Sequence, residues 1–168
     1  MEANKHKFQV VVGGCTERQT QQIKTLTGFE GGELPFRYLG VPITASKLTK
    51  IECNGLAEKI VARVHIWATR NISFVSKAML INNVIFGMFN YWASIFILPT
   101  PVVDKVTQIC RNFLWGGTEE FKKLPHISWQ TACRGEKYGG IGLKDFHAWN
   151  RAMVAKLVWA IAEKKDML

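Results

Sequence analysis

The sequence predicts a mainly α-helical protein, a helical bundle preceded by a small N-terminal α/β element. Short β-rich runs broken by glycines are confined to about the first 44 residues. From about Ser46 onward, apolar residues recur at intervals of three and four, which is the period of one helix face. The 168 residues suffice for one core with an appendage, and six Trp and ten Phe favour a core rich in aromatic rings. We therefore divide the chain into residues 1–44 and 45–168.

The N-terminal part contains the signals of strand, helix and strand. Phe8–Val12 is a short β-rich run that two glycines end, so we expect a strand. Thr16 is a typical N-cap, and Thr16–Thr27 reads as a helix that Gly28 ends. Phe29–Glu33 reads as a glycine-rich loop. Phe36–Ile43 is expected to be an irregular strand or a tight hairpin, because it contains a glycine and a proline.

The first helix of the second part carries a basic stripe beside its apolar face. The apolar face is formed by residues spaced three or four apart: Cys53, Leu56, Ile60, Val64 and Trp67. Lys59, Arg63 and Arg70 lie on a neighbouring stripe, at intervals of four and seven. This stripe is either an ordinary solvated helix face or a ridge that contacts phosphates, and the spacing leaves both readings open.

A long uncharged helix is predicted from Phe74 to Leu98. Ala78–Leu98 lacks any charged residue, which raises the alternative of a membrane span. Three asparagines argue against that alternative. Small and polar residues also repeat at helical spacing on one side: Ser76, Asn83, Gly87, Asn90 and Ser94. A narrow polar stripe on an otherwise apolar helix is more typical of the central helix of a bundle.

Three further helices follow. Pro99-Thr100-Pro101 breaks the long helix, and Thr100 is expected to cap the next one, with Asp104 in its first turn and Gly116-Gly117 at its end. A short helix is predicted at Ser128–Arg134, then a glycine-rich turn at Glu136–Gly142. Asp145 is expected to cap the last helix. We expect its buried face to hold Trp149, Met153 and Leu157, widened by Val154, Val158 and Ile161.

The charge distribution favours a polyanionic partner. The formal net charge is +9, and residues 35–100 carry seven basic but two acidic side chains. Between Glu58 and Asp104 there is no carboxylate. A basic surface concentrates polyanions, so we predict nucleic acid as a partner. The four cysteines are far apart and no signal peptide is evident, so we expect free thiols and an intracellular location in nucleus or cytoplasm.

The residue patterns of common catalytic and metal sites are missing. Two-metal nucleotidyl transfer needs clustered carboxylates, whereas the three aspartates are isolated and are explained by helix starts or a chain end: Asp104, Asp145 and Asp166. There is no phosphate-binding P-loop sequence. His126, Cys133 and His147 match no zinc pattern, and we favour structural roles for them. We therefore expect no enzyme activity, no cofactor and no metal.

Several blocks resemble, in order, the LINE-type (non-long-terminal-repeat) retrotransposon reverse transcriptases of plants. LPFRYLGVPI (Leu34–Ile43) resembles the block that follows the catalytic palm, near the primer grip. The later blocks are IWATRNISFVSKAMLINNVIFGMFNYW (Ile66–Trp92), FILPTPVVDKVTQICRNFLWGG (Phe96–Gly117), ISW (Ile127–Trp129) and KYGGIGLKDFHAWNRAMVAKLVW (Lys137–Trp159). NKHK (Asn4–Lys7) resembles the tail of the last palm motif. The resemblance covers nearly the whole chain.

The resemblance implies a role in holding a template–primer duplex. Residues 1–44 would be the end of the palm and residues 45–168 a thumb and connector, with the catalytic aspartate pair upstream of this chain. Phosphate-facing candidates would be Lys59, Arg63, Arg70 and Lys77. Primer-grip candidates would be Arg37, Tyr38 and Gly40. Such a module would hold an RNA-containing duplex by shape and backbone, without reading its sequence.

A second hypothesis assigns the chain to a different class of function. A retroelement fragment adopted by its host could act as a protein-interaction or regulatory module. Strands that would extend the palm sheet in a complete enzyme would then form an open edge, carrying Phe8, Val10, Val12 and Phe36. An open edge pairs readily with another chain, so we expect a homodimer or a partner protein there.

Overall fold

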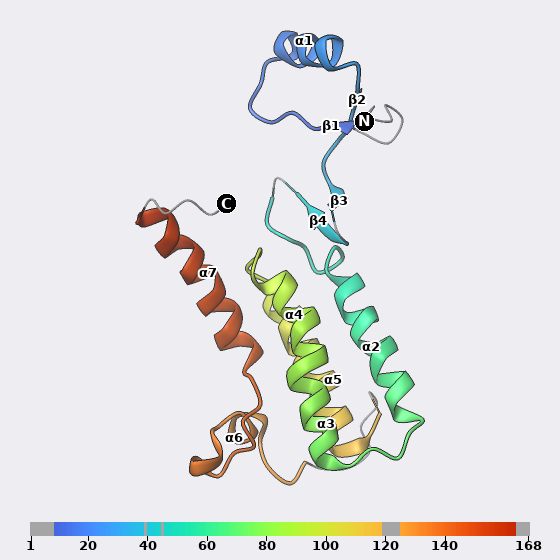
Figure 1. Cartoon of the computed structure of the whole chain (residues 1–168), viewed down its shortest axis with the longest axis vertical. Coiled ribbons are helices and arrows are strands. Elements are labelled where there is room, and N and C mark those ends of the chain that lie inside the picture. Colours follow the sequence, from blue (N-terminus) through green and yellow to red (C-terminus); the bar gives the residue numbers. More distant parts are fainter. Residues whose placement is uncertain (1–8, 39, 45, 119–124, 164–168) are drawn as a thin grey trace, which may run out of the picture. The chain divides into compact units, whose positions relative to one another are not determined.

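The computed structural model describes residues 9–38, 40–44, 46–118 and 125–163. It divides into two compact units, Met1–Lys47 (unit 1) and Leu48–Leu168 (unit 2), and each is considered by itself. Helices dominate the described residues, and strands occur only in unit 1 (Figure 1). The predicted fold class, a mainly α-helical protein with a small N-terminal α/β element, is therefore confirmed.

Unit 1 begins with a helix enclosed by two very short strands. Strand β1 (Gln9–Val10) is followed along the chain by α1 (Glu17–Thr27) and then by β2 (Glu30–Gly31). The two strands pair in parallel. The predicted cap is confirmed, because the side chain of Thr16 accepts from the backbone N–H of Gln19, whose side chain reaches back to the N–H of Thr16. The prediction of a loop at 29–33 was wrong at β2, since β1 offers backbone partners that no local pattern reveals.

The second half of unit 1 is a tight hairpin, one of the two forms that the sequence predicted. Strands β3 (Phe36–Tyr38) and β4 (Val41–Ile43) pair antiparallel, with Tyr38 opposite Val41. Gly40 in the connection has φ +83°, a conformation that costs glycine little. Among the described residues of unit 1, only Val41 and Pro42 are fully buried. The predicted edge residues Val10, Val12 and Phe36 are half-buried, while Phe8 lies outside the described residues.

Unit 2 opens with α2 (Asn54–Ala68), which packs on α5 (Thr100–Gly116). Its buried face is Leu56, Ile60 and Val64, preceded by buried Cys53, as the periodicity predicted. Trp67 continues the face, with its ring centroid 5.6 Å from that of Phe113. The turn leading into α2 has a capping box, in which Glu52 accepts from the N–H of Thr49 (2.7 Å) and Thr49 Oγ1 from the N–H of Glu52 (3.3 Å).

The predicted long helix is interrupted. It consists of α3 (Phe74–Leu80), a π-helical turn η2 (Ile81–Ile85) and α4 (Phe86–Ala93), so the prediction of helix up to Leu98 was wrong for the last residues. Ile85, Phe89 and Trp92 are buried, whereas Ser76 and Asn83 of the polar stripe are exposed. Among the described residues, no helix has the length and apolar character of a membrane span.

The start of α5 differs in detail from the prediction. Pro99 occupies the N-cap position and Thr100 is the first helical residue, so Thr100 is not the cap. Asp104 lies beyond the first turn, where its Oδ1 is 2.8 Å from Nε2 of His147. The helical spacing of Val102, Val106, Ile109 and Phe113 predicts one buried face, and all four are buried. The helix ends at Gly116, followed by Gly117 with φ +83°.

The C-terminal elements are the short α6 (Trp129–Ala132), a 3₁₀ turn η3 (Glu136–Tyr138) and α7 (Phe146–Ala162). The predicted caps Ser128 and Asp145 are confirmed, and each accepts from a backbone N–H of the first turn. Helix α7 packs on α4 and α5 with Phe146 and Asn150 as its buried residues.

The predicted buried face of α7 was wrong in its outer half. Val158 and Ile161, in the outer half, are 61 % and 65 % exposed. Trp149, in the first turn, is 37 % exposed although its ring packs on Phe86. Met153, Val154 and Leu157 are only half-buried. Figure 1 shows why, since the C-terminal half of α7 leans away from α4. Periodicity identified an apolar face, but only its first turns meet another helix.

Asn150 is the side chain that fixes α7 to the rest of unit 2. It is 4 % exposed; its Nδ2 donates to the carbonyls of Ala93 (3.1 Å) and Phe96 (2.7 Å), and its Oδ1 accepts from the N–H of Leu98 (2.9 Å). We predict that Asn150→Ala lowers the free energy of unfolding by roughly 2–3 kcal/mol, because it leaves buried backbone groups without partners. Urea denaturation followed by circular dichroism measures this.

Asn83→Ala is the matched control for that prediction, since Asn83 is an exposed asparagine in the same unit. We expect it to change the unfolding free energy by less than about 0.5 kcal/mol. An Asn150→Ala protein as stable as the control would show that the three hydrogen bonds contribute little.

Candidate nucleic-acid interface

The clearest candidate for a surface that binds the nucleic-acid backbone is the exposed edge of α2 with the turn after it. Burial of Leu56, Ile60 and Val64 turns the opposite side of the helix to solvent, and Lys59 and Arg63 are exposed there. They are one turn apart, about 6 Å along the axis. Arg70 is also exposed and follows the C-cap, in a turn where its N–H donates to the carbonyl of Trp67 (3.0 Å). We call Lys59, Arg63 and Arg70 the basic ridge.

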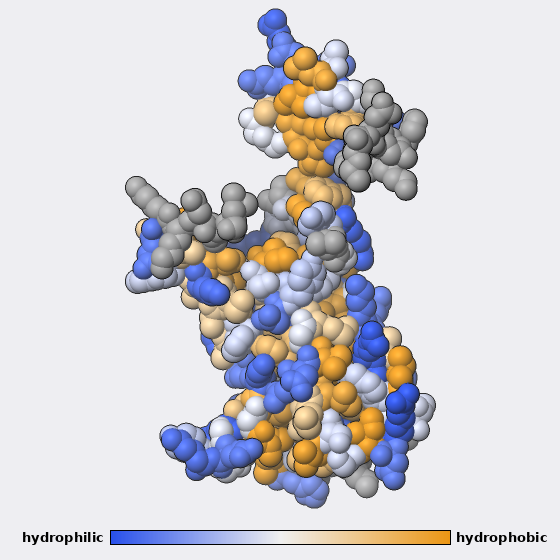
Figure 2. Space-filling model, in the orientation of Figure 1, coloured by the Kyte–Doolittle hydropathy of each residue, from blue (hydrophilic) through white to orange (hydrophobic). Residues whose placement is uncertain are grey.

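The side chains of the basic ridge are exposed to solvent. No ion pair between described residues involves any of its three side chains. Figure 2 shows hydrophilic side chains along the edge formed by α2, interspersed with apolar ones. Glu58 is the one acidic residue of α2, and it is also exposed. Three exposed cations on one edge give a locally positive potential, which suits a polyanion.

Lys77 has a different environment from the ridge. It is half-buried, and its ammonium lies 5.9 Å from the ring centroid of Phe113 and close to Gly117, at the C-terminal end of α5. A cation at this place interacts favourably with both the ring face and the negative end of the helix dipole. Its contacts are therefore those of a side chain that joins α3 to α5.

The primer-grip candidates lie in unit 1. Arg37 and Tyr38 are both exposed on β3, and Tyr38 is 61 % exposed. As neighbours along a strand they point to opposite faces, so one flat ligand surface cannot contact both in the same way. Gly40 is accounted for by its positive φ in the hairpin connection. The three candidates thus form two separate surface positions and a turn.

The imidazole and thiol groups that could have formed a metal site have separate contacts. His126 packs edge-on against Trp115, with 5.7 Å between ring centroids, and His147 contacts Asp104. Burial, aided by the charge of Asp145, raises the pKa of the Cys133 thiol to about 11. Among the described residues, no group of three His, Cys, Asp or Glu side chains has the arrangement of a metal site.

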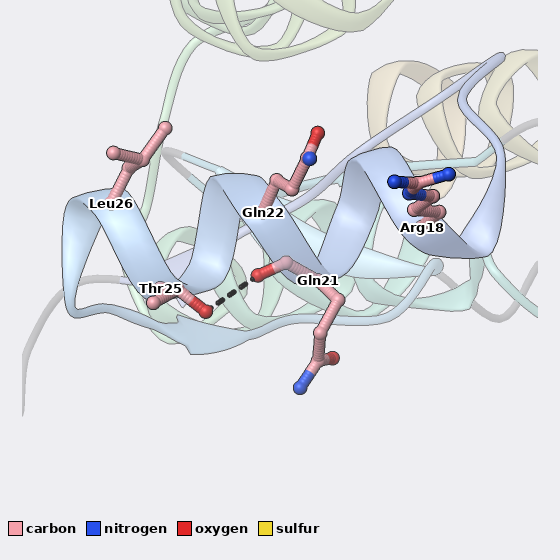
Figure 3. A pocket seen from close by; sticks show the side chains of 5 residues that line it. All are labelled: Arg18, Gln21, Gln22, Thr25 and Leu26. Carbon is pink, nitrogen blue, oxygen red and sulfur yellow. Dashed lines mark hydrogen bonds between the residues drawn. The ribbon is translucent and has the colours of Figure 1, made fainter.

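Two hollows in the surface are large enough to hold a small ligand. One, of about 400 Å³, lies where α5 meets the starts of α6 and α7, and its walls carry Asp104, Arg111, Asp145 and His147. These opposite charges select no ligand class, and both carboxylates already accept hydrogen bonds or contact His147. The other lies on α1 and is lined by Arg18, Gln21, Gln22, Thr25 and Leu26 (Figure 3). All five side chains come from one helix, and Thr25 Oγ1 donates to the carbonyl of Gln21 (2.9 Å).

Sequence reasoning missed the roles of three asparagines. Asn82 Nδ2 donates to the carbonyl of Gly142 (3.1 Å), and its Oδ1 accepts from the N–H of Lys144 (3.2 Å). Asn90 Oδ1 accepts from Nε1 of Trp149 (2.7 Å), and Asn150 makes the three bonds described above. For Asn82 and Asn90, their place within an uncharged helical run was the available signal, although partners about 60 residues away cannot be identified from it.

Comparisons with known proteins give two plant relatives. No protein-family model matches the chain. It is 28 % identical over 128 residues to an Arabidopsis thaliana protein named "putative ribonuclease H protein", an alignment that covers 76 % of this chain and 21 % of that protein. It is 30 % identical over 79 residues to an "uncharacterized mitochondrial protein" of the same plant, covering 46 % of this chain and 51 % of that protein. The aligned regions thus span about a fifth and a half of these relatives.

The four cysteines give a test of the described packing. The structure has all four as free thiols, with Cys15 exposed. Burial raises the pKa of Cys53 to about 11, as it does for Cys133, and it also raises the pKa of Cys110. We predict that iodoacetamide at pH 8 modifies Cys15 and spares the other three until urea is added, because the thiolate is the reactive form. Mass spectrometry of the peptides measures this.

The same pKa shifts predict the direction of the pH dependence of stability. The folded state holds Cys53 and Cys133 as thiols up to a pKa of about 11, whereas the unfolded thiols ionise at about 8.5. The contribution of these two thiols to the free energy of unfolding is therefore complete below about pH 8.5 and is lost as the pH rises toward 11.

The iodoacetamide experiment has an outcome that contradicts the described packing, namely rapid modification of Cys133 in the native protein at pH 8.

Proposed function

We propose that this chain is a retroelement-derived plant protein fragment that binds the nucleic-acid backbone without reading sequence and without catalysing a reaction. Three lines of support converge. The sequence blocks resemble the part of LINE-type reverse transcriptases after the palm, one relative is named for ribonuclease H, and the basic ridge offers three exposed cations on one edge. The ridge is the observation that carries the proposal. As part of this proposal, we assign unit 2 to the thumb and connector of such a reverse transcriptase.

The chemistry of the ridge favours backbone contact over base reading. Lysine and arginine neutralise phosphates and release their counterions, which gives affinity that falls steeply with salt. Base reading would need a helix or strand shaped to enter a groove with several polar side chains. The exposed side chains near the ridge include Ala62 and Ile66, which cannot make such contacts. An RNA–DNA duplex held by its phosphates and shape fits this surface.

A binding role, with catalysis left to residues outside this chain, is supported by what the aspartates do. Asp145 caps α7 by accepting from the N–H groups of His147 and Ala148. Asp104 contacts the ring of His147. The third, Asp166, is 21 residues further along the sequence than Asp145 and is not adjacent to another aspartate. Two-metal phosphoryl chemistry needs carboxylates that share metal ions, whereas Asp145 caps a helix and Asp104 contacts His147.

The ridge predicts the effect of charge reversal on binding. Lys59→Glu/Arg63→Glu/Arg70→Glu should weaken binding to an RNA–DNA duplex at least tenfold. If all three cations contact phosphates, it should also reduce the slope of log K against log salt by about 2–3. Fluorescence anisotropy with a labelled duplex, titrated at several salt concentrations, measures both quantities. Circular dichroism verifies that the variant is folded.

A matched control separates the ridge from net charge. Lys105→Glu/Arg151→Glu/Lys156→Glu reverses three exposed cations on α5 and α7 and changes the formal net charge of +9 by the same amount. We expect this control to keep most of the salt slope. Equal losses in the two variants would show that binding follows overall charge, and no binding of the unaltered protein at low salt would refute the proposed function.

A second candidate function is a protein-interaction module adopted by the host, with unit 1 as the contact. The observation that favours it is the small buried interior of unit 1, in which α1 has no buried residue and Leu26 is 86 % exposed. Strands β1 and β2 have two residues each and leave backbone groups for another chain.

Pairing through unit 1 predicts self-association. Light scattering at about 100 μM should then give a dimer mass. Val10→Lys/Val12→Lys should return the protein to a monomer, because charges in β1 and just after it oppose pairing through that edge. Leu26→Lys, on α1, is the control that tests whether the strands rather than the helix make the contact. A monomer at every concentration would exclude the homodimer.

A further inference from the structure

We propose that the connection between α6 and α7, residues 133–144, is a second nucleic-acid contact that binds unpaired bases by stacking on Tyr138. We call this segment the α6–α7 loop. The inference rests on the proposed function and deepens it, because it adds a form of nucleic acid and a surface that the basic ridge does not supply. The loop was predicted only as a glycine-rich turn.

The loop has a defined conformation, fixed by its own backbone. The N–H groups of Gly139 and Gly142 donate to the carbonyls of Glu136 (3.0 Å) and Arg134 (2.9 Å). Those of Ile141 and Leu143 both donate to the carbonyl of Ala132 (3.1 and 3.3 Å). Leu143 is 2 % exposed and anchors the far end in the core. A loop held in this way loses little conformational entropy when it binds a ligand.

Glycines are required where the loop turns back on itself. A Cβ on Gly140 would collide with the backbone carbonyl of Arg134. Gly139 has φ +76°, a conformation in which a larger residue is strained. The close return of the backbone therefore depends on the glycine-rich composition, and it places the 3₁₀ turn η3 with Tyr138 on the outside.

The loop is also braced by the long helix. Asn82, in the π-helical turn, bonds the carbonyl of Gly142 and the N–H of Lys144 with its one amide group. A π turn inserts an extra residue into a helix and changes the direction of the side chains, and such turns are frequent at functional sites. The two hydrogen bonds of Asn82 thus link the loop to a helical turn in which Ile81 and Ile85 are buried.

The braced loop presents an aromatic ring to solvent. Tyr138 is 67 % exposed, so its ring contributes little to the core. The ammonium of Lys137 lies 5.0 Å from its centroid, and Arg134 is exposed on the same loop, whose single acidic residue is Glu136. The ammonium of Lys144 lies instead 4.0 Å from the ring centroid of Phe86. Figure 2 shows the connection between α6 and α7 as a projecting, hydrophilic surface. An exposed ring among cations is the arrangement that holds a base by stacking and its phosphates by charge.

The occupant that fits is a single strand. Paired bases are stacked on their neighbours and cannot lie on a protein ring, whereas unpaired bases can. Within unit 2, the loop and α2 lie on opposite sides in Figure 1. A duplex along the basic ridge therefore leaves the loop available for an unpaired segment. The charge of the loop excludes an equally basic partner and favours a polyanion.

The test compares two nucleic acids and four proteins. Fluorescence anisotropy at one moderate salt concentration is measured with a labelled single-stranded RNA and a labelled RNA–DNA duplex. The proteins are the unaltered chain, Tyr138→Ala, Tyr138→Trp and the control Tyr91→Ala, which removes an exposed tyrosine from α4. Stacking is worth about 1–3 kcal/mol per base, so Tyr138→Ala should weaken single-strand binding roughly 5- to 150-fold. Tyr138→Trp and the control should stay within about threefold, and duplex binding should be unchanged.

The outcomes separate this inference from the proposed function. Unchanged single-strand affinity in Tyr138→Ala, while the ridge variant loses duplex binding, overturns the inference and leaves the function intact. Equal weakening of single-strand and duplex binding by Tyr138→Ala also overturns it, because stacking acts on unpaired bases. Loss in Tyr138→Ala with recovery in Tyr138→Trp supports it. Failure of the unaltered chain to bind either nucleic acid removes both.

Discussion

Unit 2 depends on how its one long helical run ends. Helix α4 stops at Ala93, and the carbonyls and N–H groups around that end need partners inside the protein. One side chain, Asn150, supplies two donors and an acceptor to Ala93, Phe96 and Leu98. Because Asn150 belongs to α7, the same bonds that close the turn between α4 and α5 also set where α7 packs. The positions of three helices thus converge on a single buried amide, and a residue without both hydrogen-bonding functions cannot replace it.

The other asparagines of the long run apply the same principle at a smaller scale. Asn82 and Asn90 contact the segment from Gly142 to Trp149, so the polar side chains of α3–α4 are used to position the start of α7. This explains why an uncharged helical run carries several amides. It also explains why the α6–α7 loop has a fixed conformation although its residues are mostly exposed: its rigidity comes from Asn82 and from Leu143, which are bonded to or buried in the helical core.

The features that were predicted correctly are those that depend on residues close together in the sequence. The caps at Thr16, Ser128 and Asp145 were predicted because each depends on a side chain and an N–H group two or three residues away. The buried face of α2 followed from its period. The misses have tertiary causes: β2 exists because β1 pairs with it, and the outer half of α7 is exposed because no described helix reaches it. One miss had no tertiary cause. The capping box at Thr49 and Glu52 is a local motif that the sequence contains, and it was not predicted.

Similar reasoning explains how far the candidate interface could be derived. Lys59 and Arg63 were placed correctly on the solvent side of α2, since the buried residues Leu56, Ile60 and Val64 leave them no other side. Lys77 carries the same charge, yet it lies against Phe113 at the end of α5, where the neighbouring helix turns a surface cation into a packing contact. Tyr138 shows the converse, because the backbone of its loop holds an aromatic ring outside the core. Whether a cation or a ring is available to a ligand is therefore decided by which apolar groups the fold buries next to it, and that is a property of the packed helices rather than of the residue.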